Sequence, residues 1–234
     1  MALERHGSSI YLHQKKYITD ILAGYRMEDA YGCATPALPT LLTKREEDKP
    51  IADVPYAEAV GSLMYLCMGT RPDIQFAVAQ VSRYTSDHAD RHWKAVKRIF
   101  RYLINTPSLA LVYKFGVTAH LAGFADADYA ADTDTRRSRS GWIWQIGGAP
   151  ISWSSTMQKC VSLSTAEAEY ISLTEAIKEF LWLKQLAGDM GAVQPLHVPL
   201  YEDNSAAIEY TKTGRNFRKL KHVDVRLHFV RDVT

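Results

Sequence analysis

The spacing of apolar residues changes at about residue 119, and this change constrains the fold more than any other feature of the chain. Before it, apolar residues recur at helical spacing in four segments, over residues 16–25, 56–68, 73–84 and 92–104. A short strand is predicted over 8–13, and residues 33–55, with four prolines and a run of charges, are expected to be a loop. The pattern therefore predicts a mainly helical first part, residues 1–118.

The second part, residues 119–234, alternates short strand patterns with helices. Alternation and turn residues predict three consecutive strands, over 120–128, 141–146 and 150–154, the last two joined by a tight turn at Gly147 and Gly148. A long helix is expected over 165–187, then a strand over 197–201 and a helix over 205–211. Three strands followed by helix, strand and helix predict a mixed α/β fold.

Composition excludes several classes of protein. With 47% apolar and 23% charged residues, the chain is not wholly disordered. Its three widely spaced cysteines, without a C-x-x-C pair, exclude a disulfide framework and a cysteine zinc site. No apolar run reaches the roughly 20 residues of a membrane span, and the first residues lack a secretory signal. We expect an intracellular protein of the cytoplasm or nucleus, not a secreted one, with no membrane partner.

The net charge of +2 requires any nucleic-acid surface to be a local patch. The segment 92–104 carries one apolar stripe, and beside it runs a stripe of four cations that begins one residue before the segment: Arg91, Lys94, Arg98 and Arg101. Such a stripe is usually a solvated face, and the alternative is a surface that follows a phosphate backbone. The sequence leaves both interpretations open.

Asp126 is the first candidate for a chemical role. Alternation along the strand 120–128 places Phe124, Asp126 and Asp128 on one face. A carboxylate near the end of a central strand is costly unless it binds something. The alternative is an acid that faces the following loop.

Two glutamates at the start of the long helix compete for the second role. Ser164 and Glu167 have the spacing of a capping box, which gives Glu167 a structural task. Positions 167 and 169 point about 200° apart on a helix. Glu169 lies at the margin of the buried stripe and is therefore better placed to face a site over the sheet.

Asp203 follows the predicted strand 197–201 and precedes a helix. Asn204 or Ser205 can cap that helix, and Asp203 itself is an alternative cap. Three acids at strand ends and helix starts could hold a hard cation such as Mg²⁺, and two such ions about 4 Å apart can support phosphodiester hydrolysis. Spacing alone does not decide this, since such acids are common on α/β scaffolds.

The residues of several short motifs, and the order of these motifs, resemble those of a known protein family. Six segments occur in fixed order in the second part: GFADADYA (123–130), RRSRSG (136–141), PISWSS (150–155), LSTAEAEY (163–170), EDNSA (202–206) and KHVDVR (221–226). They resemble the ribonuclease H domain of Ty1/copia-type retrotransposon polyproteins. In the first part, GSLMYL (61–66), TRPDI (70–74) and HWKAVKRI (92–99) resemble the segment between that family's polymerase palm and its ribonuclease H.

The resemblance implies a ribonuclease H-like fold for residues 119–234, a mixed sheet with flanking helices, and a reverse transcriptase thumb or connection region for residues 1–118. It implies cleavage of the RNA strand of RNA/DNA hybrids with Mg²⁺, or Mn²⁺ as a substitute. The family's two aspartates and its glutamate correspond to Asp126, Asp203 and Glu169, which would bind two metal ions and form the catalytic centre.

Two groups of cations are candidates for contact with the nucleic-acid backbone: Arg136, Arg137 and Arg139, and Arg215, Arg218, Lys219 and Lys221. Solvated surface charge is the alternative for each. The expected partners are an RNA/DNA hybrid and the upstream polymerase domain of the same polyprotein.

The departures from the family pattern limit the expected activity. The polymerase motif Tyr-x-Asp-Asp is absent, so we do not expect a polymerase. The family's last strand and last helix, which bring a fourth metal-binding aspartate, would follow Thr234, and Asp224 corresponds to a different, helix-surface acid. We therefore expect weak or absent nuclease activity. The alternatives are a remnant that binds nucleic acid without cutting it, and a chain with no biochemical role.

Overall fold

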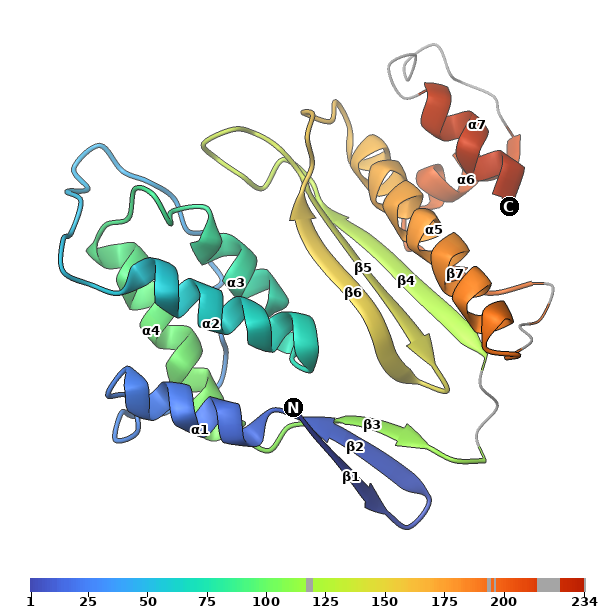
Figure 1. Ribbon diagram of the computed structural model, residues 1–234. Coiled ribbons are helices and arrows are strands. Elements are labelled where there is room, and N and C mark those ends of the chain that lie inside the picture. The colour runs from blue at the N-terminus through green and yellow to red at the C-terminus, as the bar shows by residue number, and fades with distance from the viewer. Residues whose placement is uncertain (117–119, 193–194, 196, 214–223, 234) are drawn as a thin grey trace. The chain divides into compact units, whose positions relative to one another are not determined.

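A computed structural model describes residues 1–116, 120–192, 195, 197–213 and 224–233. The chain divides into two compact units, Met1–Gly116 and Val117–Thr234, which are taken one at a time below (Figure 1). Together the described residues form a mixed α/β structure with two sheets. Among the described helices, none combines the length and apolar character that crossing a bilayer requires.

The first unit contains four α-helices and a three-stranded antiparallel sheet. The helices are α1 (Lys15–Gly24), α2 (Tyr56–Gly69), α3 (Gln75–Ser82), preceded by a 3₁₀ turn at Pro72–Ile74, and α4 (Asp90–Asn105). The strands are β1 (Ala2–His6), β2 (Ser9–His13) and β3 (Leu111–Lys114), in that order across the sheet. The predicted helices, the strand over 8–13 and the loop character of 33–55 are confirmed.

Strands β1 and β3 were not predicted. Four of the five residues of β1 are exposed, so it lacks the alternation that marks a half-buried strand. Strand β3 is only four residues long and pairs with β2 from the far end of the unit. Neither strand can therefore be predicted from the residues within and next to it.

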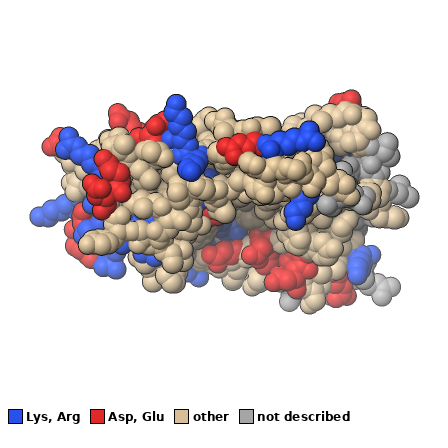
Figure 2. Space-filling view, turned by 90° about the horizontal axis from the view of Figure 1, so that it is seen from below, with Lys and Arg blue, Asp and Glu red and all other residues tan. Residues whose placement is uncertain are grey.

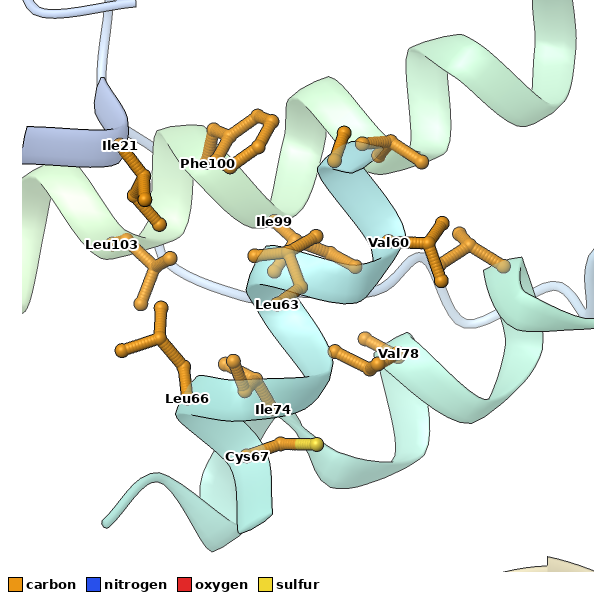
Figure 3. Close-up of a cluster of buried hydrophobic side chains, with 14 of the residues drawn as sticks. Ile21, Val60, Leu63, Leu66, Cys67, Ile74, Val78, Ile99, Phe100 and Leu103 are labelled. Atoms are coloured by element: carbon orange, nitrogen blue, oxygen red, sulfur yellow. The ribbon is translucent and has the colours of Figure 1, made fainter. Parts of the chain in front are cut away.

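The core of the first unit lies where its four helices meet (Figure 3). Each helix contributes its apolar stripe, with Ile21 from α1, Leu63 from α2, Val78 from α3 and Phe100 from α4 all buried. Helical spacing of apolar residues therefore decides the packing of this unit.

A buried arginine ties the end of α2 to the end of α4. Arg71 is 0% exposed, and its guanidinium donates to both carboxylate oxygens of Asp73 at 2.7–3.2 Å. It also donates to the carbonyl oxygen and the Oγ1 of Thr106, at 2.8 and 2.7 Å. A planar, five-donor guanidinium suits this geometry, and a lysine could not reproduce it.

The cation stripe of α4 serves a third purpose that the sequence did not suggest. Three of its four cations donate to the segment 31–43: Arg91 to the Thr43 carbonyl oxygen, Arg98 to Thr35 Oγ1 and Arg101 to the Tyr31 carbonyl oxygen, at 2.6–3.1 Å. The fourth, Lys94, pairs with Asp90 one turn earlier. The stripe is therefore mainly an anchor for the preceding loop.

His92 joins α4 to the same loop as a neutral side chain. It is 0% exposed and stacks on Tyr84 with ring centroids 3.9 Å apart. Its Nδ1 accepts from the Ala89 N–H at 2.8 Å, so its Nε2 carries the proton and donates to the Thr43 carbonyl oxygen at 3.3 Å. Burial lowers the pKa of His92 below its usual value.

The second unit is built on a four-stranded sheet. Its elements are β4 (Leu121–Asp128), β5 (Arg139–Ile146), β6 (Ala149–Met157), α5 (Thr165–Asp189), β7 (Leu200–Tyr201), α6 (Ser205–Thr213) and α7 (Asp224–Val233). The order is β6-β5-β4-β7, antiparallel except for the parallel pair β4–β7. The strand predicted over 197–201 is shorter than expected, because Pro199 has no N–H for the ladder.

Ser172 and Trp144 are among the side chains that hold helix α5 against the sheet. Ser172 Oγ lies 2.7 and 3.0 Å from the carbonyl oxygens of Asp126 and Gly141, and it bonds the helix to β4 and β5. Trp144 Nε1 donates to the Ala176 carbonyl oxygen at 3.0 Å. Gly123 makes room for the indole, since a Cβ there would lie 2.6 Å from the Trp144 ring.

Replacing Arg71 with Met is expected to lower the free energy of unfolding by about 3 kcal/mol, because the change removes the guanidinium that pairs with the Asp73 carboxylate and the Thr106 carbonyl oxygen. Urea titration followed by circular dichroism measures this. Lys16→Met on the exposed face of α1 is the matched control and should change stability by less than about 0.5 kcal/mol. An equally small effect of Arg71→Met would contradict the structural role of the network.

His92 predicts a pH dependence of stability. In the unfolded chain its imidazole takes up a proton near pH 6.5, whereas in the folded chain the pKa is lower. The unfolded state therefore binds more protons at this site as the pH falls below 6.5, and the contribution of His92 to stability decreases toward acid. Unfolding free energies of wild type and His92→Gln are compared from about pH 7.5 to about pH 5, and relative to the variant, wild type should lose stability toward acid. The exposed His197→Gln is the control, and an unchanged slope in His92→Gln would refute the assignment.

Candidate metal centre

Two of the candidate acids stand side by side because β4 and β7 run in parallel. The register pairs Phe124 with Tyr201, and the two rings stack with centroids 5.0 Å apart. Asp126 lies two residues after Phe124, and Asp203 lies two residues after Tyr201, so both are on the same side as the stacked rings. The parallel pairing therefore brings two carboxylates together from segments far apart in the sequence.

The third acid comes from the first turns of α5. Carboxylate oxygens of Asp126, Glu169 and Asp203 all lie within 4.8 Å of one another. The two aspartates are exposed, while Glu169 is only 4% exposed. The three residues chosen from the sequence thus form one group, the acid centre, which is open to solvent on one side and buried on the other.

The capping interactions place the competing glutamate elsewhere. Ser164 is the N-cap of α5, and its Oγ accepts from the Glu167 N–H at 3.2 Å. Glu167 in turn accepts from the Leu163 N–H at 2.9 Å. The predicted capping role of Glu167 is confirmed, and Glu169 alone of the two joins the acid centre.

The alternative role for Asp203 is also resolved. The side chain of Asn204 caps α6, because its Oδ1 accepts from the N–H groups of Ala206 and Ala207, each at 3.0 Å. Asp203 is not used as a helix cap and contributes to the acid centre instead. Asp128, on the same strand face as Asp126, is not part of the group.

The surroundings of Glu169, the buried acid of the centre, destabilise its ionised form. Burial, together with the negative charges of Glu202, Asp126 and Asp203, raises the pKa of Glu169 to about 8, while the Ala127 N–H opposes the rise. Within the described residues, Glu169 Oε2 is buried and has no hydrogen-bond partner. A carboxylate in this state requires either a proton or a cation.

Glu202 is a part of this environment that sequence reasoning missed. It lies two residues beyond Leu200, whose side chain packs in the core beneath α5, and it is half-buried. Its Oε1 accepts from the Asn204 N–H at 3.1 Å, and its Oε2 is buried without a partner among the described residues. Burial raises the pKa of Glu202 as well. Strand alternation from Leu200 was the signal that could have identified it.

The donor set fits a hard divalent cation. All three ligand side chains offer carboxylate oxygens, and none offers sulfur or imidazole nitrogen. Mg²⁺ prefers such ligands, and Mn²⁺ accepts them. A cation bound here would satisfy the orphaned Glu169 Oε2 and would neutralise the repulsion among the carboxylates, which is the physical reason to expect one.

The candidate nucleic-acid contacts have different environments. Arg136 and Arg137 are exposed. Arg139 is only 6% exposed and donates from Nη1 to the Ser155 carbonyl oxygen at 3.3 Å, so little of it is accessible. Arg215, Arg218, Lys219 and Lys221 lie outside the described residues. On the face seen in Figure 2, lysines and arginines are scattered among acids and do not form one continuous basic patch.

Comparisons with known proteins give a consistent set of relatives. The chain is 42% identical to the retrovirus-related Pol polyprotein from transposon TNT 1-94 of Nicotiana tabacum, over 98% of the chain and 18% of that protein. It is 38% identical to the Pol polyprotein from transposon RE2 of Arabidopsis thaliana, over 98% of the chain and 16% of that protein. The secreted RxLR effector protein 161 of Plasmopara viticola matches 56% of the chain at 45% identity, over 92% of its own length.

The chain therefore spans less than a fifth of the two polyproteins that it matches almost from end to end. No protein-family model and no solved structure matches it.

Replacing Glu169 with Gln is expected to raise the free energy of unfolding of the metal-free chain by about 1 kcal/mol at about pH 9, where the carboxylate is ionised. The change removes a buried charge that repels its neighbours while keeping the side-chain shape. Chemical denaturation in the presence of a chelator measures it. Glu175→Gln is the control on the same helix, since Glu175 forms an exposed pair with Lys178. Destabilisation by Glu169→Gln would contradict the repulsion described above.

Proposed function

Because the chain belongs to the retrovirus-related Pol polyproteins of copia-type transposons, we propose that it is a segment of a reverse transcriptase/ribonuclease H that hydrolyses the RNA strand of RNA/DNA hybrids. The observation that carries the proposal is the acid centre, in which oxygens of Asp126, Glu169 and Asp203 lie within 4.8 Å of one another. Mg²⁺ is the proposed cofactor, with Mn²⁺ as a substitute.

The topology of the second unit supports a ribonuclease H-like fold. Three antiparallel strands are followed by a long helix and then by a fourth strand parallel to the first, which is the mixed sheet that the motifs lead one to expect. The acids stand at the carboxyl ends of the parallel pair β4–β7, where ligand sites of open α/β sheets are found. We assign residues 1–118 to the thumb or connection region that precedes such a domain.

The proposed mechanism assigns one task to the two exposed aspartates and another to the buried glutamate. Two divalent cations would supply activation of the attacking water and stabilisation of the leaving 3′ oxygen. Asp126, at the end of β4, and Asp203, after β7, are exposed and would hold cations where a scissile phosphate can approach. Glu169 offers a ligand from the buried side, fixed through Ser172 one turn further along α5. The fold thus keeps the three ligands in place before substrate arrives.

The polyprotein context supports the proposed substrate class. A segment of a Pol polyprotein is linked to other domains of the same chain, and an upstream polymerase domain is the proposed partner that supplies the hybrid. Selection of the RNA strand would come from contacts to its 2′-hydroxyls and to the groove shape of the hybrid. The exposed Arg136 and Arg137 are the proposed phosphate contacts, whereas Arg139 is largely buried and donates to the Ser155 carbonyl oxygen. The proposed compartment is the cytoplasm or the nucleus.

The direct test is cleavage of a labelled RNA/DNA hybrid by the full chain with Mg²⁺. Wild type should cut only the RNA strand, and Asp203→Asn should reduce the rate at least about 100-fold, since it removes a negative ligand from the metal centre. Glu175→Gln, on the exposed side of α5, should cut at the wild-type rate. A chelator should abolish cleavage by every active variant.

Two other outcomes have a definite meaning. If no variant cuts the hybrid but wild type binds it with a steep salt dependence, the chain is a binding module that grips nucleic acid without hydrolysing it. If Asp203→Asn cuts as fast as wild type, the acid centre is not the site of hydrolysis and the proposal fails.

A further inference from the structure

Glu202 lies beside the acid centre but is not one of its three ligands. It stands between Tyr201, the last residue of β7, and the ligand Asp203. Side chains alternate along a strand, so Glu202 is on the same side as Leu200, which packs in the core beneath α5. Asp203 is exposed, whereas Glu202 is half-buried. The two neighbouring acids therefore have different environments and can have different tasks.

A cavity of the second unit shows that Glu202 lies next to α5. The cavity has a volume of about 490 Å³, and Glu202 lines it together with residues of α5, α6 and α7. One of these residues is Leu173, which lies one turn after Glu169 on the same face of the helix. Part of the wall is apolar and includes Ile177 and Phe180. Glu202 is therefore close to the buried acid of the centre and next to apolar side chains.

The carboxylate of Glu202 is fixed by the backbone on the far side of Asp203. Its Oε1 accepts from the Asn204 N–H at 3.1 Å, so the bond spans the residue that serves as a ligand. Asn204 is itself held in place, because its Oδ1 accepts from the N–H groups of Ala206 and Ala207 in α6. The turn that presents Asp203 is therefore fixed on both sides, and Glu202 provides one of the two contacts.

That bond does not require the negative charge of Glu202. An uncharged glutamine would offer the same acceptor oxygen to the Asn204 N–H. The charge has a cost, because Oε2 is buried without a hydrogen-bond partner and the described residues provide no ion pair for this carboxylate. After burial, the charge of Glu202 is also the largest cause of the raised pKa of Glu169. A charge that destabilises the metal-free chain is explained if the metal-bound state uses it.

We propose that Glu202 is a positioning residue of the metal centre, whose charge attracts the divalent cations from the buried side without contacting them. This inference rests on the proposed function, which supplies the cations. Formal charges support it, since two divalent cations carry four positive charges, the three ligands carry three negative charges, and Glu202 adds the fourth. The attraction acts beside apolar side chains, where charges interact more strongly than in water.

The same geometry disfavours a direct ligand role for Glu202. One carboxylate oxygen accepts from the Asn204 N–H and the other is buried, so neither is open to a cation at the solvent side. Glu202 is also outside the group of acids whose oxygens lie within 4.8 Å of one another. A purely structural role is the remaining alternative. That role requires an oxygen at position 202 but not its charge, so the two roles predict different results.

The experiment measures Mn²⁺ binding to the full chain through the electron paramagnetic resonance signal of free Mn²⁺. Glu202→Gln keeps the acceptor but removes the charge, and it should raise the Kd of the tightest site about 10- to 100-fold. Glu202→Asp keeps the charge and can still accept from the N–H two residues on, so it should bind nearly as tightly as wild type. Glu175→Gln is the control, because it removes one charge from the exposed side of α5 and should bind like wild type.

Urea denaturation of the metal-free chain separates the charge from a structural role. Glu202→Gln should unfold at the same urea concentration as wild type or at a higher one, although it binds Mn²⁺ more weakly. A lower urea midpoint with unchanged Mn²⁺ affinity indicates a structural role alone and overturns the proposal. Equal losses of affinity in Glu202→Gln and Glu202→Asp also overturn it, because the charge then has no effect, as does the absence of Mn²⁺ binding by wild type.

These results do not depend on cleavage of a hybrid. If the variants bind Mn²⁺ as expected but wild type does not cut the hybrid, the proposed activity fails and the role of Glu202 in cation binding stands. If wild type cuts the hybrid and Glu202→Gln binds Mn²⁺ as tightly as wild type, this inference fails and the proposed activity stands.

Discussion

Repulsion among like charges is the constraint on which the second unit depends. Carboxylates whose oxygens lie within 4.8 Å of one another repel, and this repulsion destabilises the folded state. The carboxylates stay close only because rigid elements hold them. The rigidity comes from backbone elements: the parallel pair β4–β7 sets the spacing of Asp126 and Asp203, and the Ser172 bond to the Asp126 carbonyl oxygen fixes α5 and hence Glu169. The domain thus stores unfavourable electrostatic energy in the metal-free state, which a divalent cation can release. Such an arrangement is typical of a site selected for binding and not for stability.

Local patterns predicted the parts of this protein that local physics decides. Helical spacing identified α4 and α5, and the capping box separated Glu167 from Glu169 on sequence spacing alone. The features that local patterns did not predict share a cause, since each depends on residues that are distant in the sequence. Strand β3 forms because β2 offers it an edge, and Glu202 is important because α5 places Glu169 beside it. The arginines of α4 looked like a solvated or phosphate-binding face, but their hydrogen bonds go to carbonyl and hydroxyl oxygens of a loop much earlier in the chain.

Buried carboxylate oxygens without hydrogen-bond partners lie next to the acid centre of the second unit. Among the described residues they include Glu169 Oε2 and Glu202 Oε2. Both are acidic, so the environment that they form suits a cation.

The parallel pairing of β4 with β7 also has a consequence for how the protein is made. Strands β4, β5 and β6 can pair as soon as each is synthesised, because they are consecutive and antiparallel. Asp203, in contrast, follows α5 in the chain and can reach Asp126 only when β7 is available to pair with β4. The acid centre therefore cannot assemble until the chain has been synthesised as far as Asp203. A chain that ends after the three-stranded meander contains Asp126 but lacks both Glu169 and Asp203.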